Sequence, residues 1–428
     1  MNVPALRSPN AALVLDLLRT AGEAGISRLE LAERTGLTPQ AVSKITARLR
    51  SEGLATEAGH RASTGGKPRT VLRLVPTAGY AVGVHLDRDE LTTLLTDLAG
   101  TVVARRTRAV ALGEGAEPVL AAVAEEVRAL TAGFAASGTY ASEATAGPRA
   151  DHARGFTAGP HRDQVRNPAP GPRVDPVPDP APGPRVDDVP DSVPGPRADP
   201  VPDSVPGSLP APVLGVGVAM PGPLDHRAGV PGRVTGFPEW DGHPVREELA
   251  RRIGLPVVLD KDTNAAALGL AVRPAAPSSF AYVHLGTGLG AGLVLGGAPL
   301  RGDRTGAGEL GHQTVQLDGP VCGCGGRGCL EVLCLAAVAR GKEAEAARIL
   351  GAGAANVVRL LDIDEVLLGG RLVLAAPEVF AGGVREVLAG LGLTAPVRVA
   401  GDRDAVAEGA AWLVLAPLFG GGSAPRAA

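Results

Sequence analysis

The sequence lacks any long hydrophobic run. No apolar stretch reaches the ~18 to 20 residues that a membrane-spanning helix needs. The N-terminus also lacks a basic-then-apolar segment of the kind that directs export. These two absences argue against a helical membrane protein and predict a protein that acts in the cytoplasm without contact with a membrane.

Cysteine is scarce as well. The chain has four cysteines in 428 residues, and all of them lie between positions 322 and 334. Cysteines this close together are unsuited to a disulfide framework in a large intracellular chain. Their spacing favours metal binding instead.

The length and the charge distribution indicate several domains of different character. A chain of 428 residues is too long for one compact core, so we expect two or three domains. The formal net charge is -3, but residues 1–75 carry eleven Lys or Arg against six Asp or Glu, which leaves -8 for the remainder. A basic N-terminal unit is what attraction to nucleic-acid phosphates requires, although this surplus could equally be a solvated face.

A repetitive proline-rich tract interrupts the chain. Glycines recur every twelve residues from Gly147 to Gly207, and the later copies read Pro-Gly-Pro-Arg-Val-Asp-Pro-Val-Pro-Asp or close variants. Proline at this density removes backbone donors and fixes φ, so we expect polyproline II or disorder. We interpret residues 136–208 as an insertion, either a tolerated surface addition grown by repeat slippage or a spacer that binds a partner.

The first segment has the pattern of a winged helix-turn-helix. Apolar residues recur at helical spacing over residues 10–54, and breaks at 22–25 and 36–38 divide them into three short helices. Two β-like runs within residues 54–74 flank a glycine-rich tip at 63–67, which predicts a hairpin wing.

Local capping signals mark where the helices of this segment begin. Ser27 and Glu30 have the capping-box spacing, and Thr38 followed by Pro39 predicts the start of the third helix. Val42, Ile45 and Leu49 of the third helix are expected to pack inward. Polar and basic side chains of that helix and of the wing suit base edges and phosphates. The alternative is a winged domain used only for protein contacts. The residues predicted to contact DNA are Thr38, Gln40, Ser43, Lys44 and Arg48 on the third helix and Arg61, Lys67 and Arg69 on the wing.

The rest of the chain alternates strand-like and helical stretches. Residues 80–86, 91–98 and 101–104 predict a three-stranded meander, followed by a helix over 119–134. After the proline-rich tract, a buried-type strand at 213–218 opens an α/β pattern that continues to the C-terminal region.

Four potential metal ligands lie within eighteen residues, namely His312, Cys322, Cys324 and Cys329. Three thiolates and one imidazole are a ligand set that zinc favours, and the glycines between them allow a short loop to surround one ion. Four protein ligands leave no open position for a metal-bound water, so the predicted site is structural, with one zinc per chain. The alternative is a group of free buried cysteines. Cys334 lies outside the pattern and is expected to be a small core residue.

The segment that carries these ligands resembles the zinc motif of the ROK family, which comprises repressors, uncharacterised reading frames and sugar kinases. The resemblance covers most of the chain outside the proline-rich tract. It implies an actin-like ATPase fold, with two α/β lobes around a cleft. The expected fold class is therefore multidomain, with an N-terminal α+β winged helix-turn-helix before a two-lobed α/β body. Other matching segments are 221–223, 238–242, 261–267, 286–292 and 369–370.

The resemblance also implies roles for individual residues. Asp262 matches the catalytic base of the kinases, although an aspartate there could also simply cap a helix. Asp262, Glu309, His312 and Glu331 match positions that bind sugar hydroxyls. Carboxylates accept hydrogen bonds from vicinal hydroxyls. Glu331 lies close to the ligand Cys329, so the metal loop would orient it.

One departure from the family pattern argues against kinase activity. In the kinases an Asp-x-Gly-Gly-Thr-Lys type loop follows the first strand of the body; its glycines admit phosphate and its Asp helps to hold magnesium. This chain has His85-Leu86-Asp87-Arg88-Asp89-Glu90 instead. Carboxylates facing a triphosphate, without a glycine backbone, should abolish productive ATP binding. A second glycine-rich loop is retained at Gly286, Thr287, Gly288 and Gly290, but alone it is a weak phosphate signal and fits a tight hairpin equally well.

Three further departures concern the pocket and the second lobe. Lys261 stands where the family usually has a sugar-contacting Asn, and Leu270 stands where Glu is frequent. About a dozen residues separate Glu331 from the helical stretch 344–361, so we expect a reduced helical layer.

Together these observations predict a winged helix-turn-helix at 1–76, a ROK body at 77–135 and 209–422, and the insertion at 136–208. The predicted function is a nucleoid-associated regulator of carbohydrate metabolism, most simply a repressor. It would bind double-stranded operator DNA as a homodimer or higher homo-oligomer and respond to a sugar or sugar phosphate. One alternative is an active, glucokinase-like, ATP-dependent sugar kinase with a DNA-binding domain. Another is a ligand-blind DNA-binding scaffold regulated by a protein partner.

Overall fold

The computed structural model describes residues 8–61, 69–137 and 212–420. The chain divides into a unit formed by residues 1–140 with 206–428 and a second unit at 141–205. The interpretation of residues 136–208 as an insertion therefore falls outside the described residues, apart from 136 and 137 at the end of a helix. Among the described residues, no helix has the length and apolar character needed to cross a bilayer.

The N-terminal head has the three helices and the two wing strands that the sequence predicts. The predicted capping interactions are present at the starts of two of these helices. Ser27 Oγ accepts a hydrogen bond from the Glu30 N–H at 3.3 Å, and Glu30 Oε2 accepts one from the Ser27 N–H at 2.8 Å, which completes the capping box. Thr38 caps the third helix, with Pro39 at its first position. The wing tip, residues 62–68, lies outside the described residues. The head consists of α1 (Pro9–Ala21), β1 (Ile26–Ser27), α2 (Arg28–Thr35), α3 (Pro39–Ser51), β2 (Ala55–Arg61) and β3 (Arg69–Leu74), with sheet order β1-β3-β2.

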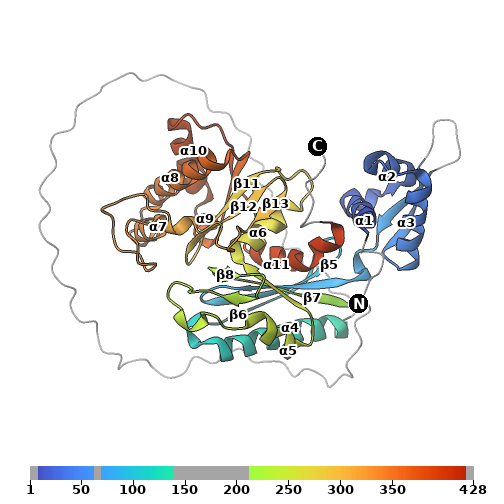
Figure 1. Ribbon diagram of the computed structural model, residues 1–428, viewed down its shortest axis with the longest axis horizontal. Coiled ribbons are helices and arrows are strands. Elements are labelled where there is room, and N and C mark those ends of the chain that lie inside the picture. Colours follow the sequence, from blue (N-terminus) through green and yellow to red (C-terminus); the bar gives the residue numbers. More distant parts are fainter. Residues whose placement is uncertain (1–7, 62–68, 138–211, 421–428) are drawn as a thin grey trace, which may run out of the picture. The chain divides into compact units, whose positions relative to one another are not determined.

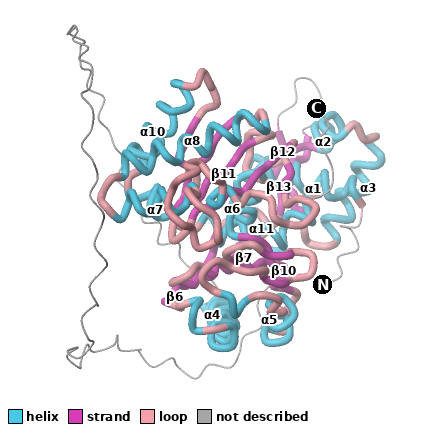
Figure 2. Tube along the Cα trace, turned by 60° about the vertical axis from the view of Figure 1, so that its left-hand side comes forward, coloured by secondary structure: helices cyan, strands magenta, loops and turns pink. Residues whose placement is uncertain are grey.

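The first lobe of the body is a five-stranded sheet of order β10-β7-β4-β5-β6. The predicted meander supplies three neighbouring antiparallel strands, β4, β5 and β6. After the proline-rich tract, β7 pairs in parallel with β4, and β10 pairs in parallel with β7. Two helices, α4 and α5, cover one face of this sheet (Figures 1 and 2). The elements are β4 (Tyr80–Leu86), β5 (Glu90–Asp97), β6 (Val102–Ala109), α4 (Ala116–Ser137), β7 (Val213–Met220), α5 (Val245–Ile253) and β10 (Val257–Lys261).

The second lobe is another five-stranded sheet, of order β13-β12-β11-β14-β15. Its outer face carries α7, α8 and α10, which pack on one apolar cluster with the sheet. Most of the dozen residues between Glu331 and the helical stretch 344–361 are themselves helical and belong to α7. The elements are β11 (Phe280–Leu285), β12 (Leu289–Leu295), β13 (Ala298–Leu300), α7 (Leu330–Ala339), α8 (Glu343–Leu361), β14 (Glu365–Gly369), α9 (Arg371–Ala375), α10 (Pro377–Gly390) and β15 (Val397–Val399).

Two apolar helices, α6 (Asp262–Ala271) and α11 (Ala405–Leu415), lie between the sheets (Figure 1). Glycine permits their close approach. A Cβ on Gly217 of β7 would lie 1.8 Å from the Ala410 carbonyl oxygen, and one on Gly409 would lie 1.9 Å from the Ala265 carbonyl oxygen. The shared layer joins the two sheets into the expected two-lobed α/β body. Shorter elements are β8 (Leu224–Asp225), β9 (Val230–Pro231) and the 3-10 turns at 22–24, 76–78, 112–114, 238–240, 310–312 and 416–419.

Candidate functional site

The four predicted metal ligands converge. All four donor atoms of His312, Cys322, Cys324 and Cys329 lie within 4.8 Å of one another. Cys324 Sγ lies 3.7 Å from Cys329 Sγ, and Cys322 Sγ lies 3.7 Å from His312 Nδ1. A tetrahedron with Zn–S bonds of about 2.3 Å has edges of ~3.8 Å, so this spacing suits one tetrahedral ion. The cluster could therefore hold a metal ion.

The loop conformation that brings the ligands together depends on glycine. Gly328 has φ +57°, and a Cβ there would lie 1.6 Å from the Gln316 carbonyl oxygen. Gly325, between the thiols, has φ +92°. Cys329 is also the N-cap residue of α7, so a metal held here would fix the start of that helix.

Cys334 takes no part in this cluster, as the sequence predicted. Its side chain is buried within the apolar cluster of the second lobe, and its thiol donates to the Ala346 carbonyl oxygen at 3.6 Å. Burial raises the pKa of this thiol to about 12, so it stays protonated at neutral pH.

The four predicted sugar-binding residues line one cavity. Asp262 begins α6, Glu309 precedes the turn 310–312, His312 ends that turn, and Glu331 lies in the first turn of α7. His312 directs Nδ1 toward Cys322, so its other ring nitrogen is left for the cavity. The fold therefore joins the metal cluster and the pocket through one side chain.

Two of these carboxylates already have partners. Glu331 Oε2 accepts a hydrogen bond from the Leu289 N–H at 2.8 Å. Lys261, whose side chain is only 5% exposed, donates from Nζ to Glu309 Oε1 at 3.0 Å and to the Ala307 carbonyl oxygen at 2.7 Å. Lys261 thus pairs with a carboxylate of the pocket.

Asp262 has the most perturbed carboxyl group of the pocket. Burial raises its pKa to about 7, while Lys261 and the Thr263 N–H act in the opposite direction. Its Oδ1 accepts from that N–H at 2.6 Å within the first turn of α6, whose N-cap residue is Lys261. Asp262 thus lines the pocket and binds a backbone N–H at the start of the helix.

This shift predicts a pH-dependent contribution to stability. The folded protein holds the Asp262 proton more tightly than the unfolded chain does, so the contribution is complete below pH ~4 and is lost as the pH rises through about 7. We expect the free energy of unfolding of Asp262→Asn, measured relative to that of the wild type, to increase by roughly 1–3 kcal/mol from pH 5 to pH 8.5. Urea unfolding across this range measures the gain, with the exposed Asp318→Asn as control. A difference that does not vary with pH would contradict the assignment.

Residues 87–90, which follow β4, contact the second lobe through two aspartates. Asp87 Oδ1 accepts a hydrogen bond from Thr287 Oγ1 at 2.8 Å, and Asp89 pairs with Arg371 of α9 at 2.9 Å. Glu90 pairs with Arg403 at 2.6 Å. The expectation that all three carboxylates face the cleft needs correction, because the last two are directed to arginines.

Arg88 and two histidines complete this part of the cleft. The Arg88 guanidinium lies 5.8 Å from the centre of the Phe237 ring, and a Cβ on Gly288 would lie 3.1 Å from its Nη2. Burial lowers the pKa of His85 and lowers that of His284 to about 4, so both rings are neutral at pH 7. An arginine therefore lies beside the second glycine-rich loop.

That second loop is a tight β-hairpin turn. The Gly286 N–H donates to the Gly288 carbonyl oxygen at 2.9 Å, and Leu285 pairs with Leu289 across β11 and β12. Gly290 lies in β12, where a Cβ would lie 3.1 Å from Thr263. The segment is therefore a tight hairpin, and a role in binding phosphate stays a prediction.

The third helix of the head exposes the side chains predicted to contact DNA. Thr38, Gln40, Ser43, Lys44 and Arg48 are all exposed, and so is Arg69 at the start of β3. Arg48 also pairs with Glu52 at 3.1 Å. Lys67 and the Arg61 side chain fall outside what the structure describes, so their DNA contacts stay predictions.

The buried face of α3 contains the three residues that the sequence predicts. Val42 and Leu49 are fully buried, and the half-buried Ile45 packs against the same apolar cluster. Thr46 is also fully buried, and its hydroxyl donates to the Val42 carbonyl oxygen at 2.8 Å and can accept from Arg28 Nε at 3.3 Å.

An arginine that the sequence gave no reason to single out connects the head to the body. Arg19 of α1, whose side chain is 7% exposed, pairs with Asp16 at 2.7 Å and donates to the Val272 carbonyl oxygen at 3.0 Å. Its guanidinium carbon lies 5.0 Å from the Trp412 ring centre and 5.3 Å from that of Phe419. Val272 directly follows α6, the helix that begins at Asp262 in the pocket.

Comparisons with known proteins agree with this architecture. Residues 207–339 match the ROK family, and residues 14–56 match the winged helix-turn-helix DNA-binding family. A solved ROK family transcriptional regulator, a homologue of the E. coli MLC protein, has a TM-score of 0.66 at 20% identity, over 98% of this chain and 97% of that chain. Similarity at this level of identity establishes the fold.

Two curated relatives match over different parts of the chain. The xylose repressor of Bacillus subtilis (strain 168) is 25% identical over 309 residues, which are 72% of this chain and 61% of the repressor. The glucokinase of Thermotoga maritima is 41% identical over 128 residues, which are 29% of this chain and 40% of the enzyme. The chain thus spans less than two thirds of the length of either relative.

Proposed function

Because the chain carries a ROK-family domain behind an N-terminal winged helix-turn-helix, we propose that it is a DNA-binding transcriptional repressor whose cleft binds a sugar or sugar phosphate. The observation that carries this proposal is the physical link between the two parts. Arg19 joins α1 of the head to the C-terminal end of α6, whose first residue lines the pocket.

DNA binding rests on the exposed polar face of α3. Gln40 and Ser43 can hydrogen-bond to base edges, while Lys44 and Arg48 can contact phosphates. The net charge of +5 over residues 1–75 would attract the head to DNA, so affinity should fall steeply as the salt concentration rises.

Sugar binding rests on the carboxylates around the cavity. Asp262, Glu309 and Glu331 can accept hydrogen bonds from vicinal hydroxyls, and His312 can contribute its second ring nitrogen. We assign one structural zinc ion to the four-ligand cluster. The ion would fix His312 directly and Glu331 through Cys329, two residues before it.

The same cleft is poorly suited to phosphoryl transfer. Asp87 lines the cleft and accepts a hydrogen bond from Thr287 of the second lobe, where a kinase would need a group free to bind phosphate and magnesium. Binding ATP would break this contact and bring its phosphates close to the Asp87 carboxylate. We therefore propose that the cleft senses a sugar and does not phosphorylate it.

Regulation requires a difference in sugar affinity between the DNA-competent and DNA-incompetent states. A sugar that contacts Asp262 would shift α6 at its first turn. The shift would reach the Val272 carbonyl and the Arg19 guanidinium at the other end of the helix. The orientation of α1, and with it the rest of the head, would change.

The experiment that tests this function is a fluorescence-anisotropy titration of the DNA upstream of the protein's own gene. It is repeated with xylose, suggested by the repressor relative, with glucose, suggested by the kinase relative, and with the phosphates of both. We expect nanomolar binding that one of these compounds weakens by about 10-fold or more. Lys44→Ala should weaken DNA binding without changing sugar affinity.

Two other outcomes would reject the proposal. ATP consumption with a hexose that disappears in Asp262→Asn would identify a working sugar kinase. Operator binding that no sugar alters, but that a protein partner alters, would identify a ligand-blind scaffold.

A further inference from the structure

Arg88 is a cation of the cleft that no carboxylate neutralises. The other Lys or Arg side chain that lines this cavity, Lys261, pairs with Glu309 at 3.0 Å. Arg88 makes no ion pair with any residue that the structure describes, and its guanidinium carbon lies 5.8 Å from the centre of the Phe237 ring. A ring contact of this kind restrains the side chain but uses none of its N–H groups. These donors are therefore available to a ligand.

Gly288 keeps a space open beside this guanidinium. A Cβ on Gly288 would lie 3.1 Å from Arg88 Nη2 and 3.0 Å from Glu331 Oε2. Both groups thus adjoin the same point, yet they do not pair with each other, and Glu331 Oε2 accepts from the Leu289 N–H instead. The absence of a side chain at Gly288 leaves room there for part of a ligand.

The hairpin turn at residues 286–290 adds further hydrogen-bond donors beside Arg88. The backbone N–H groups of Thr287 and Gly288 have no hydrogen-bond partner among the described residues, and both residues line the cavity. Thr263 of α6 lines it as well; this residue is 2% exposed and its hydroxyl has no hydrogen-bond partner. A guanidinium, two amide N–H groups and a hydroxyl are donors that suit the oxygens of a phosphate or a carboxylate.

The carboxylates of the cleft already have donors of their own. All four that line the cavity accept hydrogen bonds from protein groups: Asp87, Asp262, Glu309 and Glu331. Burial raises the pKa of Asp262 to about 7, so this carboxyl can take up a proton when an anion lies near it. Among the described residues, Arg88 is therefore the charge of the cleft that is left for an incoming group.

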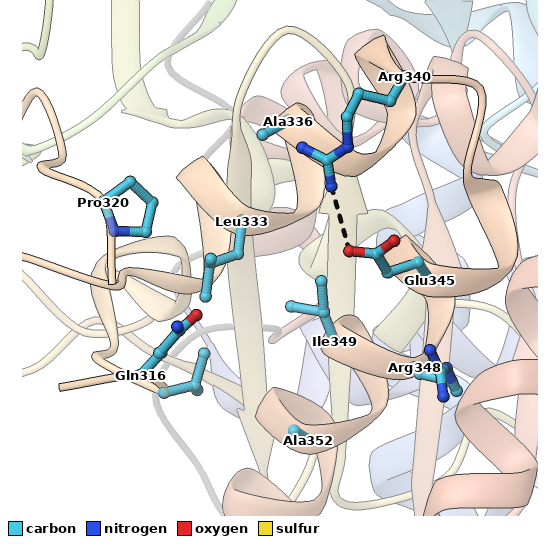
Figure 3. A pocket seen from close by; sticks show the side chains of 10 residues that line it. Gln316, Pro320, Leu333, Ala336, Arg340, Glu345, Arg348, Ile349 and Ala352 are labelled. Atoms are coloured by element: carbon cyan, nitrogen blue, oxygen red, sulfur yellow. Dashed lines mark hydrogen bonds and ion pairs between the residues drawn. The ribbon is translucent and has the colours of Figure 1, made fainter. Parts of the chain in front are cut away.

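The hollow on the outer side of the second lobe has a different lining. Figure 3 shows Leu333 of α7 and Ile349 of α8 facing each other across it, with the Arg340–Glu345 ion pair at one end. The apolar side chains offer nothing to sugar hydroxyls, and the arginine of this pair already has a carboxylate. The cleft is therefore the better site for a charged sugar.

We propose that Arg88 makes the cleft selective for a sugar that carries an anionic substituent, either a phosphate ester or a carboxylate. The substituent lies between the guanidinium and the hairpin turn at 286–290, where Arg88 donates two parallel hydrogen bonds to it. One substituent needs only this position, whereas the triphosphate of ATP would also displace the contact between Asp87 and Thr287. The inference rests on the proposed function, because it specifies the ligand of the same cleft.

Calorimetric titration of the full-length, zinc-loaded protein without DNA tests this preference. The probes are glucose, glucose 6-phosphate and glucuronate, which differ at carbon 6, together with xylose and xylose 5-phosphate. We expect one anionic probe to bind about 10-fold or more tightly than its neutral parent. In Arg88→Ala this ratio should fall below ~3, because the charged donor is lost.

Two further variants sharpen the assignment. Arg88→Lys keeps the charge but cannot donate two parallel hydrogen bonds, so it should retain part of the preference. Arg128→Ala removes an exposed arginine of α4 outside the cleft and is the matched control, which should keep the full preference. The ratio of two affinities measured on one preparation does not depend on the fraction of folded protein, and circular dichroism checks the fold of each variant.

The outcomes separate this inference from the proposed function. An advantage of a sugar phosphate would identify the substituent as a phosphate, and an advantage of glucuronate would identify it as a carboxylate. Neutral sugars that bind as tightly as the anionic probes, or more tightly, would overturn the inference and leave the proposed function intact. Binding of none of the probes would overturn both. An unchanged ratio in Arg88→Ala would reject the role assigned to Arg88.

Discussion

Cys324→Ser should remove the bound metal and the response to sugar together. We expect the zinc content to fall from about one ion per chain to less than ~0.1, because the substitution removes one of the four ligands of the ion. Sugar affinity should fall by about 10-fold or more, since loss of a metal or its orienting contacts commonly costs this much. Metal analysis and calorimetric sugar titration measure the two effects.

The physical reason is that the metal would tie together side chains that the loop backbone alone leaves less restrained. The ligand loop is rich in glycine, and two of its glycines, Gly325 and Gly328, have positive φ. Without the ion, His312 loses its fixed ring orientation and Cys329 no longer holds the start of α7. Glu331, in the first turn of that helix, would lose its position in the pocket.

Cys334→Ala is the matched control for this prediction. It removes a thiol twelve residues before Ala346 that is buried in the same lobe but lies outside the ligand cluster. The control variant should keep its zinc and its sugar response. Head function should survive in both variants, so DNA binding at low salt is the second control. A metal-free Cys324→Ser protein with an unchanged sugar response would contradict the role assigned to the ion.

Arg19→Ala should uncouple the head from the pocket. In the wild type we expect sugar to weaken operator binding by about 10-fold or more, and in the variant by less than ~2-fold. The sugar Kd measured without DNA should change little, because Arg19 lies at the far end of α6 from Asp262. Anisotropy titrations with and without sugar measure the loss of coupling.

The expected size of this effect follows from the surroundings of Arg19. A single buried guanidinium pairs with Asp16, donates to the Val272 carbonyl and lies against two aromatic rings. An alanine provides none of these contacts and leaves the carbonyl without its donor. Arg19→Lys keeps the charge but cannot bond and stack in the same way, so its coupling should be intermediate.

Arg273→Ala is the matched control for Arg19→Ala. Arg273 lies one residue beyond Val272 at the same end of α6, but it pairs with Glu408 of α11 at 3.1 Å. Its loss should leave the sugar response intact. A full response in Arg19→Ala would mean that another contact transmits the signal.

Local interactions explain why so much of this protein could be predicted from its sequence. The capping box at Ser27 and Glu30, the Thr38–Pro39 helix start and the four metal ligands all involve residues within about eighteen positions of one another. Such contacts depend on spacing and side-chain chemistry. The head, the alternating α/β body and the candidate metal cluster are features of this kind.

The sequence did not indicate which polar side chains find partners inside the folded protein. Thr46 is buried beside the predicted apolar residues of α3, because its hydroxyl hydrogen-bonds to the Val42 carbonyl oxygen. Asp89 and Glu90 were expected to face the cleft, but arginines from later in the chain take both carboxylates.

The sequence by itself thus determined the winged head, the two-lobed body and the residues that form the candidate pocket and the candidate metal cluster. Only the tertiary structure decided how these parts are connected. Arg19 and Val272 are 253 residues apart, and Asp89 and Arg371 are 282 apart. Contacts at such separations depend on which surfaces the packed core brings together, because sequence spacing carries no information about them.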